Sequence, residues 1–148
     1  MLKTIHASTT VEAPKEKVWD VLTGDESYRI WSSTFSEGSY VQTDWTVGSK
    51  IFFKDEDGSG LVGRIIEYVP LKTISIEYDG EIIDGKEEYG SDDAKAIKGA
   101  HEVYQLDEKD GVTRLTVECD MTEEYFDMMS QLWDKALEKI KQLSEGAV

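Results

Sequence analysis

The sequence predicts an α+β fold in which a curved antiparallel sheet of about six to seven strands is covered by one long C-terminal helix. Three observations support this prediction. A segment with strand periodicity opens the chain, two short helical segments follow it, and strand-like segments divided by Gly, Asp and Pro lead to a long amphipathic helix. A helix with a wide apolar stripe is the natural cover for a strongly bent sheet.

The first elements are a strand and a short helix. Residues 4–11, TIHASTTV, alternate between two faces and are rich in β-branched side chains, which favours a strand. Pro14 suits the first turn of a helix, and Gly24 ends that helix. Trp19 lies beside the apolar face, where it either plugs the end of the sheet or lines a cavity. Because an amphipathic helix must bury its apolar face, we expect Trp19 to pack in the core.

A second short helix and a series of strands follow. Asp25 can cap this helix, which runs to about Ser32 and carries Tyr28 and Trp31 on one face. Residues 38–80 then predict an antiparallel meander. Its strands are the segments SYVQ, SKIFFKD, GLVGRIIEYV and KTISIEY.

The segment at residues 81–99 keeps neither the helical nor the strand period for long. It holds six acidic residues, three lysines and three glycines. We expect an excursion or a mobile loop there, which is either a solvated insertion or a lid over a cavity mouth.

The last elements are a hairpin and the long helix. The segments HEVYQLD and VTRLTVEC, joined by EKDG, predict the hairpin. The favoured register places Glu102 opposite Val117, whereas a slip of one residue would place His101 opposite Cys119. Thr122 can cap the long helix. The apolar stripe of this helix is formed by Phe126, Met129, Trp133, Leu137 and Ile140, widened by Tyr125, Leu132, Ala136 and Leu143.

Length and charge restrict the classes of protein to which the chain can belong. Its 148 residues fit one domain spanning 1–148, and 16 basic against 31 acidic residues give a net charge of −15. Such a charge repels nucleic acid and anionic membrane surfaces. With one cysteine no internal disulfide can form, and no apolar run is long enough for an export signal or membrane insertion. We therefore expect a cytoplasmic protein.

Few side chains offer catalytic chemistry. His6 falls on the polar face of the first strand, so we expect it to face solvent. Cys119 ends an apolar alternation with Leu115 and Val117, which favours a small buried thiol rather than a nucleophile. No Cys/His spacing predicts a metal site and no glycine motif predicts a phosphate site. We therefore expect neither a metal nor a cofactor.

Glu102 is the exceptional carboxylate. In the favoured register it shares a face with Tyr104 and Leu106, where an unpaired carboxylate would be costly to bury and would have a raised pKa. Either Glu102 orients a ligand, or the local register differs and the side chain is exposed.

Several segments together resemble one family. They are VEAPKEKVWDVLT, IW, VGSKIFF, GRIIEYVPLKTISIEY, TRLTV and WDKALEKIK, in this order along the chain. They are similar to the landmarks of the START-like SRPBCC superfamily and, within it, of the activator of heat-shock-chaperone ATPase homologue family, here as a single-domain member. The resemblance implies the helix-grip fold of START domains and the birch-pollen allergen. In many relatives a cavity between sheet and helix binds hydrophobic small molecules, and the second short helix would stand near its mouth.

The leading functional hypothesis is therefore non-enzymatic binding of a small hydrophobic or amphipathic molecule. The alternative is a chaperone-associated interaction module whose core is filled by its own side chains. A cyclase-type or hydrolase-type enzyme ranks last, because no acid and base visibly converge. The expected ligand-binding residues are Tyr28, Trp31, Phe35, Phe52, Ile76, Tyr78, Glu102, Tyr104, Met129 and Trp133.

Overall fold

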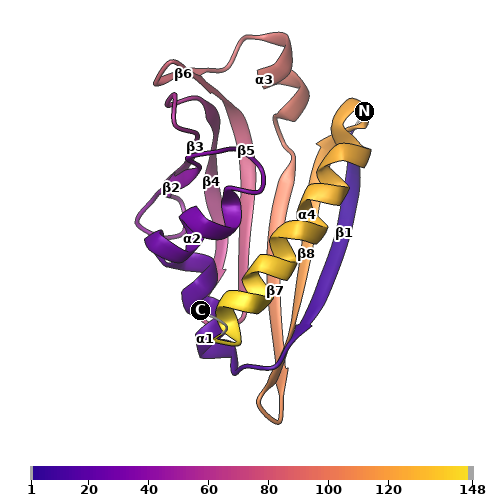
Figure 1. Cartoon of the computed structure of the whole chain (residues 1–148). Coiled ribbons are helices and arrows are strands. Elements are labelled where there is room, and N and C mark those ends of the chain that lie inside the picture. Colours follow the sequence, from indigo (N-terminus) through magenta and orange to yellow (C-terminus); the bar gives the residue numbers. More distant parts are fainter. Residues whose placement is uncertain (1, 147–148) are drawn as a thin grey trace.

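The computed structural model describes residues 2–146 and confirms the α+β prediction, with one curved antiparallel sheet and a long C-terminal helix (Figure 1). Met1, Ala147 and Val148 lie outside the described residues. The elements in chain order are β1 (Leu2–Val11), α1 (Lys15–Thr23), α2 (Asp25–Ser32), β2 (Tyr40–Gln42), β3 (Lys50–Lys54), β4 (Gly60–Val69), β5 (Thr73–Ile83), β6 (Lys86–Glu88), α3 (Asp92–Ile97), β7 (His101–Lys109), β8 (Val112–Thr122) and α4 (Glu123–Ser144).

The strand order places the first and last strands of the chain side by side. The order is β1-β8-β7-β5-β4-β3-β2, with β6 paired to β5, so the first strand lies beside the last. Two register shifts interrupt the β4–β5 pair, between Val62 and Gly63 and between Ile65 and Glu67. Such irregularities increase the local twist and bend a strand. They help to give the sheet the concave face that the helices cover.

The helix α4 crosses this concave face in front of β7 and β8 (Figure 1). Its buried residues begin at Trp133 and include Leu137 and Ile140, three members of the predicted stripe. Phe126 and Met129 of the predicted stripe are half-buried and pack against the core, whereas Tyr125, which was expected to widen the stripe, is 44% exposed, so that part of the prediction is wrong. Thr122 takes the N-cap position, but its side chain makes no capping hydrogen bond, so that part of the prediction is wrong.

The helices α1 and α2 cover the other part of the concave face. Trp19 is 6% exposed and lies edge-on to the ring of Tyr68, with 5.5 Å between the ring centroids, so the core position is confirmed. Gly24 ends α1 and also takes the N-cap position of α2. The predicted cap residue, Asp25, is instead the first helical residue. The indole Nε1 of Trp31 donates a hydrogen bond of 3.0 Å to the Val21 carbonyl oxygen, which ties α2 to α1.

Most of the segment at residues 81–99 forms short secondary-structure elements that leave the path of the main sheet, so the expectation of a mobile loop is wrong and the expectation of an excursion is met. The strand β5 continues to Ile83, a tight turn at Asp84 and Gly85 follows with positive φ angles of 50° and 80°, and β6 pairs back onto β5. The Ser91 side chain then accepts a hydrogen bond from the Ala94 amide and caps α3. Elements this short show too few repeats for a period to be read from the sequence.

The register of the β7–β8 hairpin also differs from the favoured prediction. Glu102 lies opposite Cys119 rather than Val117, because the turn is the two-residue loop of Asp110 and Gly111. Both turn residues have positive φ angles, which is typical of the two-residue hairpin turns that match strand twist. The difference is two residues, so every side chain keeps its predicted face.

Within residues 2–146, none of the helices has the length and hydropathy that crossing a membrane requires.

Candidate functional site

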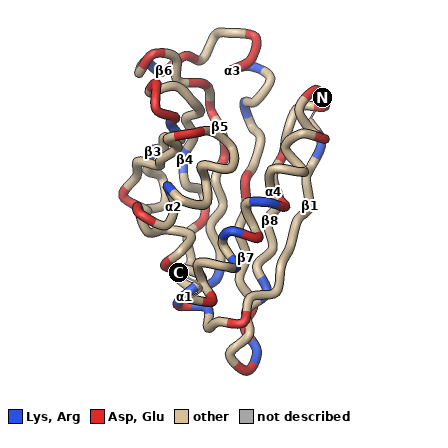
Figure 2. The backbone as a smooth tube through the Cα atoms, in the orientation of Figure 1, with Lys and Arg blue, Asp and Glu red and all other residues tan. Residues whose placement is uncertain are grey.

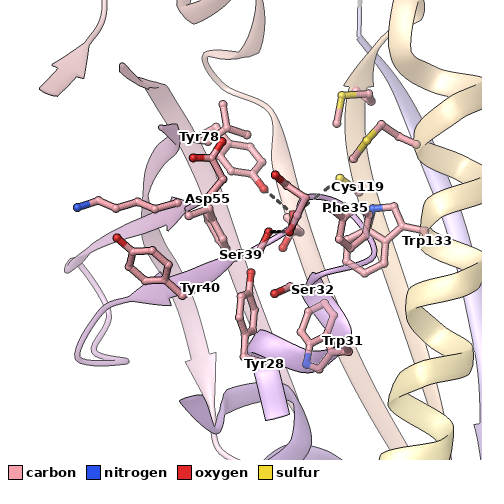
Figure 3. A pocket seen from close by; sticks show the side chains of 18 of the residues that line it. Tyr28, Trp31, Ser32, Phe35, Ser39, Tyr40, Asp55, Tyr78, Cys119 and Trp133 are labelled. Carbon is pink, nitrogen blue, oxygen red and sulfur yellow. Dashed lines mark hydrogen bonds between the residues drawn. The ribbon is translucent and has the colours of Figure 1, made fainter. Parts of the chain in front are cut away.

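A pocket of about 220 Å³ opens between the concave face of the sheet, α2 and α4 (Figure 3). Side chains alternate between the two faces of a strand, so every second residue points toward the concave face and can line the pocket. Glu102 and Tyr104 of β7, Cys119 of β8 and Tyr78 of β5 arrive in this way. Residues from distant parts of the chain therefore meet in one space.

Eight of the ten predicted ligand-binding residues line this pocket. They are Tyr28, Trp31, Phe35, Tyr78, Glu102, Tyr104, Met129 and Trp133. Phe52 does not, because it lies opposite Val62 on the other face of the sheet, and its neighbour Phe53 lines the pocket instead. Ile76 is 1% exposed and lies in the core beside the pocket. Whether the lining residues bind a ligand stays a prediction.

Aromatic rings form much of the wall. The ring of Trp133 lies 4.8 Å from that of Phe35 and 6.0 Å from that of Tyr104, both in edge-on contact. Tyr28 contacts Trp31 in the same way at 4.6 Å. Such edge-to-face contacts fix the orientations of the rings. Trp31 is only 1% exposed, so it belongs to the buried wall rather than to the mouth.

A buried carboxyl group lies among these rings. Glu102 is 6% exposed, so the alternative in which it faces solvent is wrong. The hydroxyl of Tyr78 donates a hydrogen bond of 2.5 Å to Glu102 Oε1, and the hydroxyl of Tyr104 donates to Oε2. The thiol of Cys119 lies 3.9 Å from Oε1. Three neutral side chains therefore hold the carboxyl group.

Burial dominates the electrostatics of this cluster. Loss of water raises the pKa of Glu102 above its ordinary value, and the hydrogen bonds from Tyr104, Tyr78 and Cys119 oppose this rise. Burial, and then the charge of Glu102, raise the pKa of Tyr28, Tyr78 and Tyr104 well above the usual value. The tyrosines therefore remain neutral hydrogen-bond donors at physiological pH.

Two further polar atoms of the pocket wall have no hydrogen-bond partner among the described residues. These atoms are Ser32 Oγ and Trp133 Nε1, which belong to side chains that are almost fully buried. In Figure 3 the hydroxyl groups of Tyr28 and Ser32 point toward the middle of the pocket. Buried polar groups are normally satisfied, so unpaired ones in a pocket indicate a place where a ligand or water binds.

The arrangement offers no activated thiol. Burial, and then the nearby Glu102 charge, raise the pKa of Cys119 well above its usual value, so the thiol stays protonated. His101 lies on the other face of the sheet, where its Nε2 is 3.0 Å from Glu77 Oε1. His6 is exposed, as predicted. Among the buried groups of the pocket, Glu102 is thus the one that could accept or donate a proton.

The mouth of the pocket is not among the predicted binding residues. Ser36 and Ser39 come from the segment between α2 and β2, Tyr40 begins β2, and Lys54 and Asp55 lie at and just after the end of β3. Irregular segments and the ends of short strands have no period from which their direction could be read. Clusters of three or more His, Cys, Asp or Glu residues suited to a metal ion do not occur within residues 2–146.

Comparison with known proteins identifies a family and a shared fold. Residues 12–145 match the sequence model of the family described as Activator of Hsp90 ATPase homolog 1-like protein. No curated protein matches this chain.

Solved structures of similar fold cover nearly the whole chain. Protein MLL2253 from Mesorhizobium loti is 18% identical, with a TM-score of 0.76 over 99% of this chain and 99% of that chain. The Aha1 dimer from Colwellia psychrerythraea is 18% identical, with a TM-score of 0.73 over 97% and 96%. CalU16 from Micromonospora echinospora is 16% identical, with a TM-score of 0.70 over 98% of this chain and 67% of that one. At these identities the likeness shows the helix-grip fold.

Proposed function

The chain belongs to the family of Activator of Hsp90 ATPase homolog 1-like proteins, and on this premise we propose that it binds a small, mainly apolar molecule in the pocket between the sheet, α2 and α4. The observation that carries the proposal is a concave space with aromatic walls and a few convergent polar groups, which is the usual form of a small-molecule site. Tyr28, Phe35, Tyr104 and Trp133 supply rings, and Glu102 supplies the polar group. The protein is proposed to bind this molecule without transforming it.

The size of the pocket restricts the ligand. Its volume of about 220 Å³ lies below the range of about 300 to 1,000 Å³ of most ligand sites. A ligand of one or two rings fits this space. A sterol or a long fatty acid would require α2 or α4 to move.

Amide chemical shifts provide the test. A small aromatic ligand should shift the resonances of α2 around Trp31 and those of α4 around Trp133 together, because both helices line the same pocket. Ser32→Met fills part of the pocket and sacrifices no hydrogen bond, since Ser32 Oγ has no partner among the described residues. We expect this variant to bind at least about tenfold more weakly, a loss of about 1.4 kcal/mol.

The matched control is Ser33→Met. Ser33 is the exposed neighbour of Ser32 and does not line the pocket. The Ser33→Met variant should therefore bind the ligand as tightly as the wild type. Equal binding by wild type and Ser32→Met, or the absence of paired shifts with any small aromatic ligand, would rule out the pocket as the binding site.

A second candidate function is contact with a chaperone. Tyr125 and Met128 are 44% and 53% exposed, and their spacing of three residues places them on one face of α4. The family description names an Hsp90 activator, which suggests Hsp90 as the partner to test. Addition of the chain should raise the Hsp90 ATPase rate, and Met128→Glu should abolish the effect. An unchanged rate with the wild type would remove this candidate.

A further inference from the structure

Glu102 lacks a counter-charge in its buried position. Among residues 2–146 the ion pairs involve other carboxylates, and the three groups that hold Glu102 are neutral. A carboxylate has about four acceptor sites; the Tyr78 hydroxyl and the Cys119 thiol occupy those on Oε1 and the Tyr104 hydroxyl occupies one on Oε2, so an acceptor site remains on Oε2. Glu102 lines the pocket, so a ligand donor can reach the remaining site. A buried charge without a partner is costly, and a cation on the ligand would remove that cost.

The aromatic wall favours the same kind of ligand. Rings of Tyr28, Phe35, Tyr104 and Trp133 surround the space beside Glu102. The face of an aromatic ring attracts a cation electrostatically, and the attraction is stronger where water is excluded. A wall of rings with one buried carboxylate therefore provides two independent attractions for an ammonium group.

The charge of the whole chain acts in the same direction. Its net charge is −15, and Figure 2 shows acidic residues along most of the chain rather than in one patch. Lys54 is the one basic residue that lines the pocket among residues 2–146. Its Nζ lies 5.5 Å from the ring centroid of Phe52, which is on the other face of the sheet. An anionic ligand would thus meet a repulsive field and the Glu102 carboxylate.

The unpaired polar atoms add a second requirement. The indole N–H of Trp133 has no oxygen or nitrogen acceptor among the described residues, and the Cys119 thiol beside it is only a weak acceptor, so an ether, carbonyl or hydroxyl oxygen would satisfy it better. Ser32 Oγ, also without a partner there, can donate or accept. These atoms are explained by a ligand that carries an oxygen as well as a cationic group.

From these groups together we infer that the pocket takes a small organic cation, a protonated amine on an apolar body of one or two rings, whose ammonium group binds the Glu102 carboxylate. This inference rests on the proposed function above and specifies its ligand class. The carboxylate and the rings select the amine, and Ser32 and Trp133 favour an oxygen-bearing body.

The test uses three probes that share one ring and a two-carbon skeleton but differ in charge. They are 2-phenylethylamine, 2-phenylethanol and phenylacetate, each titrated at neutral pH into the wild type while amide shifts are followed. The amine should bind at least about tenfold more tightly than the alcohol, a difference of about 1.4 kcal/mol. Phenylacetate should bind most weakly, and added salt should weaken the amine more than the alcohol.

Substitution of Glu102 identifies the group responsible. Glu102→Gln removes the charge and keeps an oxygen that accepts from the tyrosines, so the preference for the amine over the alcohol should disappear. The control is Glu67→Gln, an exposed position in β4 that changes the net charge equally and does not line the pocket. It should retain the preference within about a factor of two. If Glu102→Gln does not fold, the ranking of the probes on the wild type decides alone.

The outcomes separate the two proposals. If the alcohol or phenylacetate binds as tightly as the amine, or if Glu102→Gln keeps the preference, the cation inference is wrong and pocket binding stands. If none of the three probes binds while other uncharged ring compounds do, the cation inference is also wrong. If no small ring compound binds, both proposals fail.

Discussion

Glu102 of β7 lies directly opposite Cys119 of β8, and Glu102 Oε1 is 3.9 Å from Cys119 Sγ. The pair shares the buried, concave face of the sheet with Tyr78 and Tyr104, whose hydroxyls hold the carboxyl group. A carboxylate without a cation beside a thiol makes the thiolate unfavourable, because two negative charges would then be buried together. Of this buried pair, Glu102 is therefore the member that titrates first, and Cys119 stays neutral.

Cys119 should be chemically inert in the folded protein. It is 1% exposed, and burial together with the Glu102 charge raises the pKa of its thiol. A disulfide reagent should therefore label the native protein at least about 100-fold more slowly than the protein in urea, since reaction requires opening of the structure. The measurement is the labelling rate at neutral pH. Similar rates in both states would contradict the burial of Cys119.

Glu102→Gln should change how stability depends on pH. The folded pKa of Glu102 is raised, so the folded protein binds its proton more tightly than the unfolded chain. The contribution of Glu102 to stability is thus present below the ordinary Glu pKa and is lost as pH rises through the raised value. Glutamine does not titrate. We expect the variant to gain stability relative to the wild type as the pH rises from the ordinary Glu pKa to the raised pKa of Glu102. Above the raised pKa the difference should level off.

Urea denaturation at a series of pH values measures this difference. The control, Glu67→Gln, removes one negative charge at an exposed position of β4. A stability difference for Glu102→Gln that stays constant with pH, or one that falls, would show that Glu102 is not desolvated.

Trp133→Ala should strongly destabilise the protein. The ring is 2% exposed and packs against Phe35 and Tyr104. Its removal should cost about 3 to 5 kcal/mol, nearer half of that if the pocket already deprives one side of the ring of contacts. Tyr125→Ala, at an exposed position of the same helix, should change stability by less than about 0.5 kcal/mol.

Thermal denaturation compares the two variants with the wild type. An unchanged midpoint for Trp133→Ala would mean that α4 is not held by the sheet. The assignment of residues 1–148 to one domain stays a prediction, which a single cooperative transition in the same experiment would support.

Gly60→Ala should disrupt the β3–β4 pair at the pocket mouth. A Cβ atom on Gly60 would lie 1.8 Å from the carbonyl oxygen of Phe53, so the backbone would have to move. We expect a loss of about 2 to 4 kcal/mol in the free energy of unfolding. Gly90→Ala is the matched control, because its Cβ would meet only Glu88 Oε2, at 3.5 Å. Equal stability of the two variants would show that the close approach is absent.

The sequence by itself determined the elements that repeat a period over many residues. The alternation in β1 and β8 and the three-and-four spacing from Trp133 to Ile140 correspond to faces that the structure buries. These predictions succeeded because the backbone repeat of a long strand or helix directs its side chains whatever surrounds it. For the same reason the alternation predicted on which face of the sheet the side chains of Cys119 and Glu102 lie.

The tertiary structure decided which of these residues meet. The turn of Asp110 and Gly111 set the register that places Glu102 opposite Cys119. The pairing of β5 with β7 brought Tyr78 within hydrogen-bond distance of Glu102. Phe53 rather than Phe52 reached the pocket because the register of β3 against β4 places Phe53 opposite Leu61, which also lines the pocket. Such contacts depend on turns, bulges and pairing between strands distant in sequence, and their energies belong to the assembled sheet rather than to any local segment.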